Sequence, residues 1–186
     1  MWRTWAGLAA LLAVVSPALA APAAGRDAQI DRLRRALLAG PSASVVLTKW
    51  CADHHLAEPP RLIALRQRDF VRPADAAIRA ALAARPGERI LYRRVNLVCG
   101  AHLLSRADNW YRPGLLTAGM NRRLETTDTP FGLVVAPLNF HRRLVGVDRP
   151  DDPSAVLGVR AVLISGRGQP FSLVRETYTD ELLAKP

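Results

Sequence analysis

The stretch that decides the fold is LYRRVNLVC, residues 91–99. Apolar and polar side chains alternate along it with the two-residue period of a β-strand that has one buried face. One face carries Leu91, Val95, Leu97 and Cys99, and the other carries Tyr92, Arg94 and Asn96. We therefore predict a strand over residues 89–99, half buried against a core.

Strand signals continue on both sides of this stretch. Gly100 and Ala101 form a predicted turn into the next strand, and a turn with two glycines separates the last two strands as a hairpin. The other segments with strand character are residues 61–68, 103–110, 133–140, 156–164 and 171–178. Neighbouring strands joined by short turns favour an antiparallel sheet.

Helical signals are concentrated in the first half of the chain. Residues 27–39 form one predicted helix, capped by Asp27 and stopped by a Gly-Pro pair. A second helix begins at Ser42 or Ser44. Two further helices are predicted over residues 74–84 and 117–125. The fold class we predict is α+β, a single antiparallel sheet with helices packed on one side.

Length and charge limit the classes of protein to which this chain can belong. The chain has 186 residues, of which 49% are hydrophobic and 23% charged, so one well-cored domain is expected and intrinsic disorder is excluded. The chain has 26 lysines and arginines and 16 aspartates and glutamates, which gives a formal net charge of +10. This excess favours anionic partners but does not identify one.

The first twenty residues have the pattern of an export signal. An unbroken apolar run follows Arg3 and ends in small residues typical of a signal-peptidase site. The alternative is an uncleaved membrane anchor. We expect residues 1–20 to be removed, residues 21–26 to form a flexible leader and residues 27–186 to form the domain. The mature protein is expected to be periplasmic or secreted, without stable membrane association.

Export changes the interpretation of the two cysteines. In an oxidising compartment, Cys51 and Cys99 can pair and close a loop of about 48 residues. The alternative is that both are free thiols that pack as small hydrophobic residues. Spacing alone does not decide between these readings.

Familiar chemical motifs are missing from the sequence. No nucleophile elbow, phosphate loop, dinucleotide-binding glycine pattern or paired zinc motif is present. Cys51, His54 and His55 are close in sequence, but a helix end explains them, so no metal is expected. The arginine doublets do not build one basic helix with interleaved aromatics, so no nucleic-acid partner is expected.

Two single charges lie within predicted strands. Arg94 lies in the strand over residues 89–99, and Glu176 lies between Val174 and Tyr178 on the last strand. A charge inside a sheet is costly unless it is solvated, paired or bound to a ligand. The two charges therefore mark either an exposed face or salt bridge, or a pocket that grips a carboxylate at one end and a hydroxyl at the other.

Four blocks of sequence resemble chorismate pyruvate-lyase and its superfamily, which includes the effector-binding UTRA domains of GntR-type repressors. The likeness covers roughly residues 37–183. Its blocks are residues 41–44, residues 92–99 followed by residues 104–106, residues 129–132, and the hairpin from residue 160 to residue 178. The resemblance implies one antiparallel sheet whose helices and flap-like loops cover an internal site.

The same resemblance implies a set of site residues and a chemistry. Arg94 and Glu176 fall on the charged, catalytic positions, and Ala43 and Phe131 on positions that bind through the peptide backbone. Arg106 is the implied partner of a second carboxylate. The implied reaction is the cofactor-free elimination of pyruvate from chorismate to give 4-hydroxybenzoate. Chorismate is made in the cytoplasm, however, and export conflicts with that substrate.

Three functional hypotheses follow. The first is a chorismate-lyase-like enzyme that needs no cofactor. The second is an exported, non-catalytic binding module for a small aromatic carboxylate. The third is a structural or interaction protein whose pocket has collapsed. The sequence leaves the true ligand and the oligomeric state open.

Overall fold

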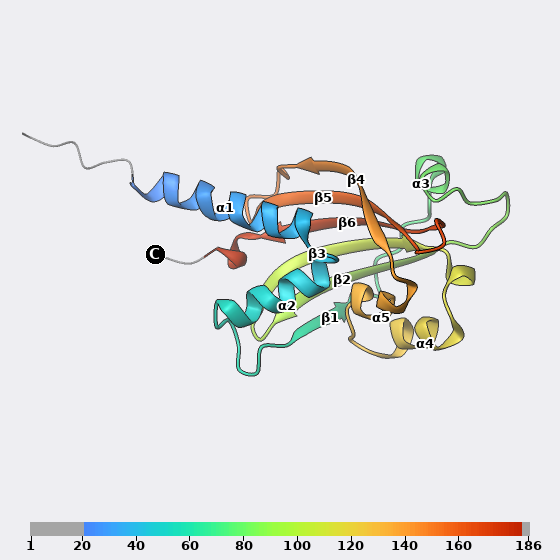
Figure 1. Ribbon diagram of the computed structural model, residues 1–186, viewed down its shortest axis with the longest axis horizontal. Coiled ribbons are helices and arrows are strands. Elements are labelled where there is room, and N and C mark those ends of the chain that lie inside the picture. The colour runs from blue at the N-terminus through green and yellow to red at the C-terminus, as the bar shows by residue number, and fades with distance from the viewer. Residues whose placement is uncertain (1–20, 184–186) are drawn as a thin grey trace, which may run out of the picture.

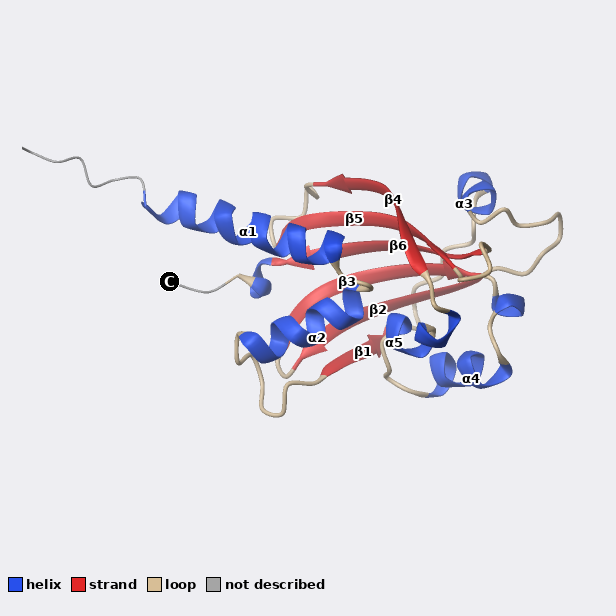
Figure 2. Cartoon of the chain, viewed as in Figure 1, coloured by secondary structure: helices blue, strands red, loops and turns tan. Residues whose placement is uncertain are grey.

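The computed structural model describes residues 21–183, which form one six-stranded sheet covered by helices (Figures 1 and 2). All neighbouring strands are antiparallel, in the order β1-β2-β3-β6-β5-β4. The strands are β1 (Leu62–Arg66), β2 (Leu91–Cys99), β3 (His102–Tyr111), β4 (His141–Asp148), β5 (Ala155–Ile164) and β6 (Pro170–Thr179). The helices are α1 (Ala21–Ala39), α2 (Ala43–Asp53), α3 (Ala76–Ala81), α4 (Ala118–Thr126) and α5 (Phe131–Val134). The predicted fold class, a single antiparallel sheet with helices, is confirmed.

Two hydrophobic clusters fill the space between the sheet and four of the helices. The first cluster joins α1 and α2 to one half of the sheet, around Leu33, Leu47 and Val95. The second joins α4 and α5 to the other half, around Leu124, Phe131 and Phe171. Figure 1 shows α1 and α2 lying across one part of this face and α4 and α5 at another. The seam between the two clusters is where a pocket forms.

The segment around α3 covers part of the opposite face. Trp110 points away from its neighbours Asn109 and Tyr111 because side chains alternate along β3. It is fully buried, and its indole Nε1 donates a hydrogen bond to the carbonyl oxygen of Arg72 at 2.9 Å. The long connection between β1 and β2 therefore supplies a second, smaller cover.

Helix starts follow the local capping signals. Ser42 Oγ accepts a hydrogen bond from the Val45 N–H at 3.2 Å, so Ser42 rather than Ser44 caps α2. Thr117 caps α4 in the same way, and Asp75 caps α3. These caps explain why all three helices begin within two residues of the expected positions, although α3 ends three residues earlier than predicted.

The N-terminal boundary of the first helix corrects one prediction. Within the described residues helix α1 covers Ala21–Ala39, so residues 21–26, which we expected to form a flexible leader, are helical. This stretch is rich in alanine, the residue with the highest helix propensity. The predicted export signal, residues 1–20, lies outside the described residues.

The strand predicted over residues 133–140 is also wrong. The chain there forms α5 and a 3₁₀ turn, Ala136–Leu138, and Asn139 then adopts the left-handed conformation. Pro137 lacks the N–H that a central strand needs, which explains the outcome. The strand of this region is β4, which begins two residues after Asn139 and which we did not predict.

Cys51 and Cys99 are joined by a disulfide, with their Cα atoms 6.2 Å apart. The bond ties the last turns of α2 to the end of β2. His54 stacks on the ring of Trp50 at the end of α2, with ring centroids 4.4 Å apart. Among residues 21–183, no helix is both long enough and apolar enough to cross a membrane.

Candidate functional site

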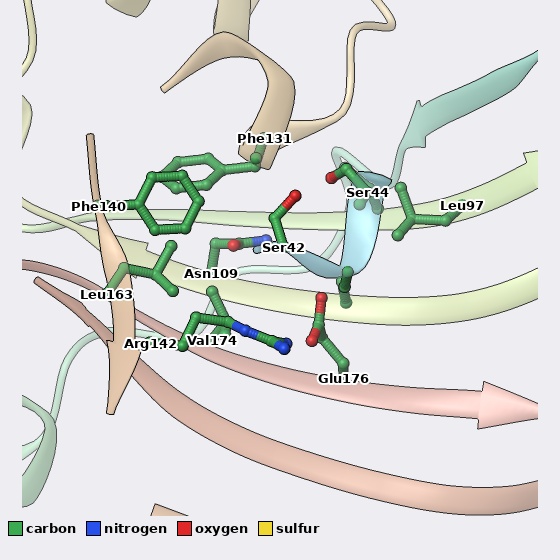
Figure 3. Close-up of a pocket in the computed structure, with 14 residues that line it drawn as sticks. Ser42, Ser44, Leu97, Asn109, Phe131, Phe140, Arg142, Leu163, Val174 and Glu176 are labelled. Atoms are coloured by element: carbon green, nitrogen blue, oxygen red, sulfur yellow. The ribbon is translucent and has the colours of Figure 1, made fainter. Parts of the chain in front are cut away.

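A pocket lies at the seam between the two hydrophobic clusters, on the helix-covered face of the sheet (Figure 3). The cavity volume is about 30 Å³, far below the ~300–1,000 Å³ that is usual for small-molecule sites, so a ligand enters this pocket only with movement of its wall side chains. Its wall is mostly apolar, with a few polar groups. The lining residues are Ser42, Ala43, Ser44, Val95, Leu97, Ala107, Asn109, Phe131, Gly132, Phe140, Arg142, Leu163, Val174 and Glu176.

Glu176 supplies the negative group of the pocket. It lies on β6 opposite Ala107 of β3 and is only 8% exposed. Its Oε2 accepts a hydrogen bond from the Tyr178 hydroxyl at 2.8 Å. Burial raises the pKa of Glu176, while the Tyr178 hydrogen bond and the charge of Arg142 act in the opposite direction. Burial also raises the pKa of Tyr178 well above its usual value, so this hydroxyl keeps its proton and acts as the donor.

Arg142 supplies the positive group. It comes from the start of β4, and its guanidinium points toward the Glu176 carboxylate (Figure 3). Its Nη2 donates to the carbonyl oxygens of Leu37 and, at 3.0 Å, of Gly40, at the end of α1. Its Nη1 is buried and has no hydrogen-bond partner among the described residues. One nitrogen therefore anchors the side chain while another remains available to an anion.

The N-terminus of α2 forms a third polar wall. The first N–H groups of a helix have no intrahelical partner and carry partial positive charge, which here belongs to Ala43 and Ser44. Helix α5 packs tightly against this terminus because Gly132 has no side chain. A Cβ at Gly132 would lie 2.9 Å from Ser44 Oγ and 3.0 Å from Ser42 Oγ. The close approach brings the backbone of both helices to the pocket.

Aromatic rings form the end of the pocket farthest from Glu176. Phe131 and Phe140 both line this end (Figure 3). Both rings pack on Phe171, at centroid distances of 6.5 and 6.0 Å. The arrangement suits an apolar ring placed against these side chains, with one polar end directed toward Arg142 and Glu176.

The structure brings together three of the five predicted site residues. Ala43, Phe131 and Glu176 all line the pocket, whereas Arg94 and Arg106 do not. Arg94 alternates with Val95, whose side chain faces the pocket, so Arg94 points to the other face of the sheet. There its guanidinium lies 4.2 Å from the centroid of the Phe70 ring.

Arg106 lies outside the pocket for the same reason. Its neighbour Ala107 faces the pocket, and Arg106 Nη1 instead lies 3.1 Å from the Asp152 carboxylate, outside the helix-covered face. The predicted pairing of Arg94 with Glu176, and the predicted role of Arg106 at a second carboxylate, are therefore corrected. The cation that faces Glu176 is Arg142.

Sequence reasoning missed Arg142 because no strand was predicted over its segment. The sequence did contain one indication, the doublet Arg142-Arg143. Side chains alternate between the two faces of a strand, so one arginine of such a doublet points inward and the other is exposed. Arg93 was missed too. It lies on the same face of β2 as Val95 and is 2% exposed, although it does not line this pocket.

We predict that the substitution Glu176→Gln stabilises the protein in a pH-dependent way. Folding raises the pKa of Glu176 above its ordinary value of 4.5, so the folded state binds this proton more tightly than the unfolded state does. The resulting contribution to the free energy of unfolding is complete below pH 4.5 and is lost as the pH rises through the raised pKa. Glutamine keeps the shape without the buried charge. The variant should match the wild type near pH 4 and exceed it by about 1 kcal/mol or more at pH 8.

Urea unfolding at steps of pH measures this difference. Glu125→Gln, at an exposed position of α4, is the matched control and should follow the wild type. A Glu176→Gln variant that is less stable than the wild type at pH 8 would contradict the prediction.

Comparison with known proteins adds a relative and several structural neighbours. No family model matches the chain. PhnF from Mycobacterium smegmatis aligns with a TM-score of 0.49 and 14% identity, over 70% of this chain and 64% of that chain. The C-terminal domain of the histidine utilization repressor from Pseudomonas syringae aligns with a TM-score of 0.48 and 14% identity, over 68% and 96%. The ligand-binding domain of a protein described as a GntR-family regulator from Bordetella bronchiseptica aligns with a TM-score of 0.46 and 20% identity, over 63% and 82%.

The sequence relative is the uncharacterised protein y4mC of Sinorhizobium fredii. It is 40% identical over 182 residues, an alignment that covers 86% of this chain and 77% of y4mC. Identity at this level over most of both chains shows that the chain belongs to the same protein family as y4mC.

Proposed function

We propose that this protein is a binding module for a small aromatic carboxylate. The observation that carries the proposal is a guanidinium and a carboxylate, those of Arg142 and Glu176, which both line one mostly apolar pocket. A half-buried cation whose Nη1 is buried and unpartnered among the described residues suits an anionic group of the ligand. A buried carboxyl that already accepts one hydrogen bond suits a neutral hydroxyl.

In this proposal each part of the pocket has one task. The ligand carboxylate lies beside Arg142 Nη1 and the N-terminus of α2, where charge and peptide N–H groups favour an anion. The aromatic ring extends from there toward Phe131 and Phe140, at the end of the pocket away from Glu176.

Binding without turnover is favoured over chorismate elimination. Chorismate carries two carboxylates, and the sequence-based mechanism assigned Arg94 and Arg106 to them. Both arginines lie outside the pocket, which leaves Arg142 as the cation that lines it. Elimination of pyruvate remains the second candidate because a carboxyl with a raised pKa, Glu176, suits proton transfer.

We also propose that the protein is exported. The signal-like pattern of residues 1–20 supports this, and so does a disulfide between Cys51 and Cys99, because such bonds persist in oxidising compartments. N-terminal sequencing of protein recovered from the periplasm of a bacterial host tests export, since cleavage should leave Ala21 as the first residue.

Isothermal titration with 4-hydroxybenzoate tests the binding function. We expect saturable binding by the wild type and an affinity about tenfold or more lower for Arg142→Gln, because a charge-assisted hydrogen bond is lost. Arg143→Gln removes the same charge from an exposed neighbour and should bind like the wild type. Incubation with chorismate should yield no 4-hydroxybenzoate above background.

Two results would overturn the proposal. One is the absence of binding by the wild type at millimolar probe concentrations. The other is equal binding by the wild type and Arg142→Gln, which would place the probe outside this pocket. Formation of 4-hydroxybenzoate from chorismate would replace the binding module with the enzymatic alternative.

A further inference from the structure

A second cleft lies at the edge of the sheet, where β1 stops short of the full length of β2. Arg66, the last residue of β1, pairs with Val95, so residues 91–94 of β2 have no β1 partner beside them. The chain after β1 instead turns away, held by a hydrogen bond from Gln67 N to Arg94 O at 2.9 Å. We call the space between these segments the arginine cleft. It is lined by residues 66–68, 70–73 and 90–94.

The cleft gathers positive charge with little compensation. Its lining includes five arginines, Arg66, Arg68, Arg72, Arg93 and Arg94, and no aspartate or glutamate. Asp108 lies nearby, 3.8 Å from Arg72 and 4.0 Å from Arg94, and it also accepts a hydrogen bond from the Tyr92 hydroxyl. One carboxylate is thus shared by two of the five cations.

Arg93 is the unusual member of this group. It is 2% exposed, and none of its three guanidinium nitrogens has a hydrogen-bond partner among the described residues. Burial, together with the charges of Arg66 and Arg68, lowers its pKa to about 10, while Asp128 acts in the opposite direction. Arg93 therefore remains charged at neutral pH, and a buried charge without a partner is unfavourable in the empty protein.

An anion in the cleft would remove this unfavourable arrangement. Guanidinium groups bind phosphate through paired, charge-assisted hydrogen bonds, and Arg66 and Arg68 lie close enough to Arg93 for their charges to act on it, whereas Arg94 points to the opposite face of the sheet. A dianion compensates more of this charge than a single carboxylate does.

We propose that the arginine cleft binds a phosphate group, either free or as the ester of a small molecule, with Arg93 at its floor and Arg66 and Arg68 at its walls. The site shares no lining residue with the pocket of Arg142 and Glu176. The inference is therefore independent of the proposed function.

Titration with two probes, inorganic phosphate and phenyl phosphate, tests this site. We expect the wild type to bind at least one of them, and Arg68→Gln and Arg93→Met each to weaken that binding, Arg93→Met by about tenfold or more. Arg142→Gln should leave phosphate binding unchanged, which separates this cleft from the other pocket. Arg35→Gln, an exposed arginine on α1, is the control for net charge and should bind like the wild type.

Thermal unfolding of the same variants gives a second measurement. Without probe, Arg93→Met should melt at a higher temperature than the wild type, because it removes a buried charge that has no partner. With probe, the wild type should gain more stability than Arg93→Met does at the same probe concentration. Binding that survives in Arg93→Met and Arg68→Gln, or the absence of binding of both probes to the wild type, would overturn the proposal.

Discussion

Replacing both Cys51 and Cys99 by alanine is expected to lower the free energy of unfolding by about 4 kcal/mol. The disulfide closes a loop of 48 residues, and a loop of this length removes roughly this much free energy of chain entropy from the unfolded state. Both cysteines are fully buried, and the bond fastens α2 to the central strand β2. Since α2 carries one wall of the pocket, we also expect weaker binding of 4-hydroxybenzoate.

Urea unfolding of the wild type with and without a reducing agent measures the same quantity independently. Reduction breaks the cross-link but keeps both sulfur atoms, so the reduced wild type and the double variant should differ only by the packing of the two side chains. A reduced wild type as stable as the oxidised protein would contradict the prediction, because it would mean that the bond does not constrain the chain.

Local signals were sufficient to predict most of the fold. Alternating side chains over residues 91–99 identified β2, and the two glycines between residues 165 and 169 identified the final hairpin. Ser42 and Thr117 marked helix starts through their side-chain oxygens. In each case the deciding interaction joins residues that are close in sequence, so the sequence contains the information directly.

The placement of Arg94 shows which sequence-based prediction was wrong. Arg94 shares its face of β2 with Tyr92 and Asn96, whereas Glu176 shares its face of β6 with the apolar Val174. That contrast already indicated opposite faces of the sheet. The strand charges alone left a shared pocket as one alternative, and the family resemblance favoured it over an exposed face or a salt bridge.

The cation that does face Glu176 could not be found by local reasoning. Strand β4 is an edge strand with charged residues and largely exposed side chains, so its sequence lacks the apolar alternation of the central strands. Arg142 is held by carbonyl groups at the end of α1, more than a hundred residues earlier in the chain. Only the assembled fold brings these segments together.

The largest single-residue effect is expected from Phe171→Ala, which should lower the free energy of unfolding by about 3–5 kcal/mol. Phe171 is fully buried at the start of β6, in the second hydrophobic cluster. Alanine would leave a cavity where the ring now contacts Phe131 and Phe140. The cost therefore combines the lost burial of the ring with the contacts that its neighbours lose.

The same substitution connects packing to binding, because Phe131 and Phe140 line the pocket that Phe171 supports from behind. We expect Phe171→Ala to bind 4-hydroxybenzoate more weakly than the wild type under conditions where both are folded. Phe171→Leu fills most of the space and is the matched control, with an expected loss of about 1 kcal/mol and little change in affinity. A Phe171→Ala variant that loses stability but binds with unchanged affinity would show that Phe131 and Phe140 hold their positions without Phe171, and would contradict its supporting role at the pocket.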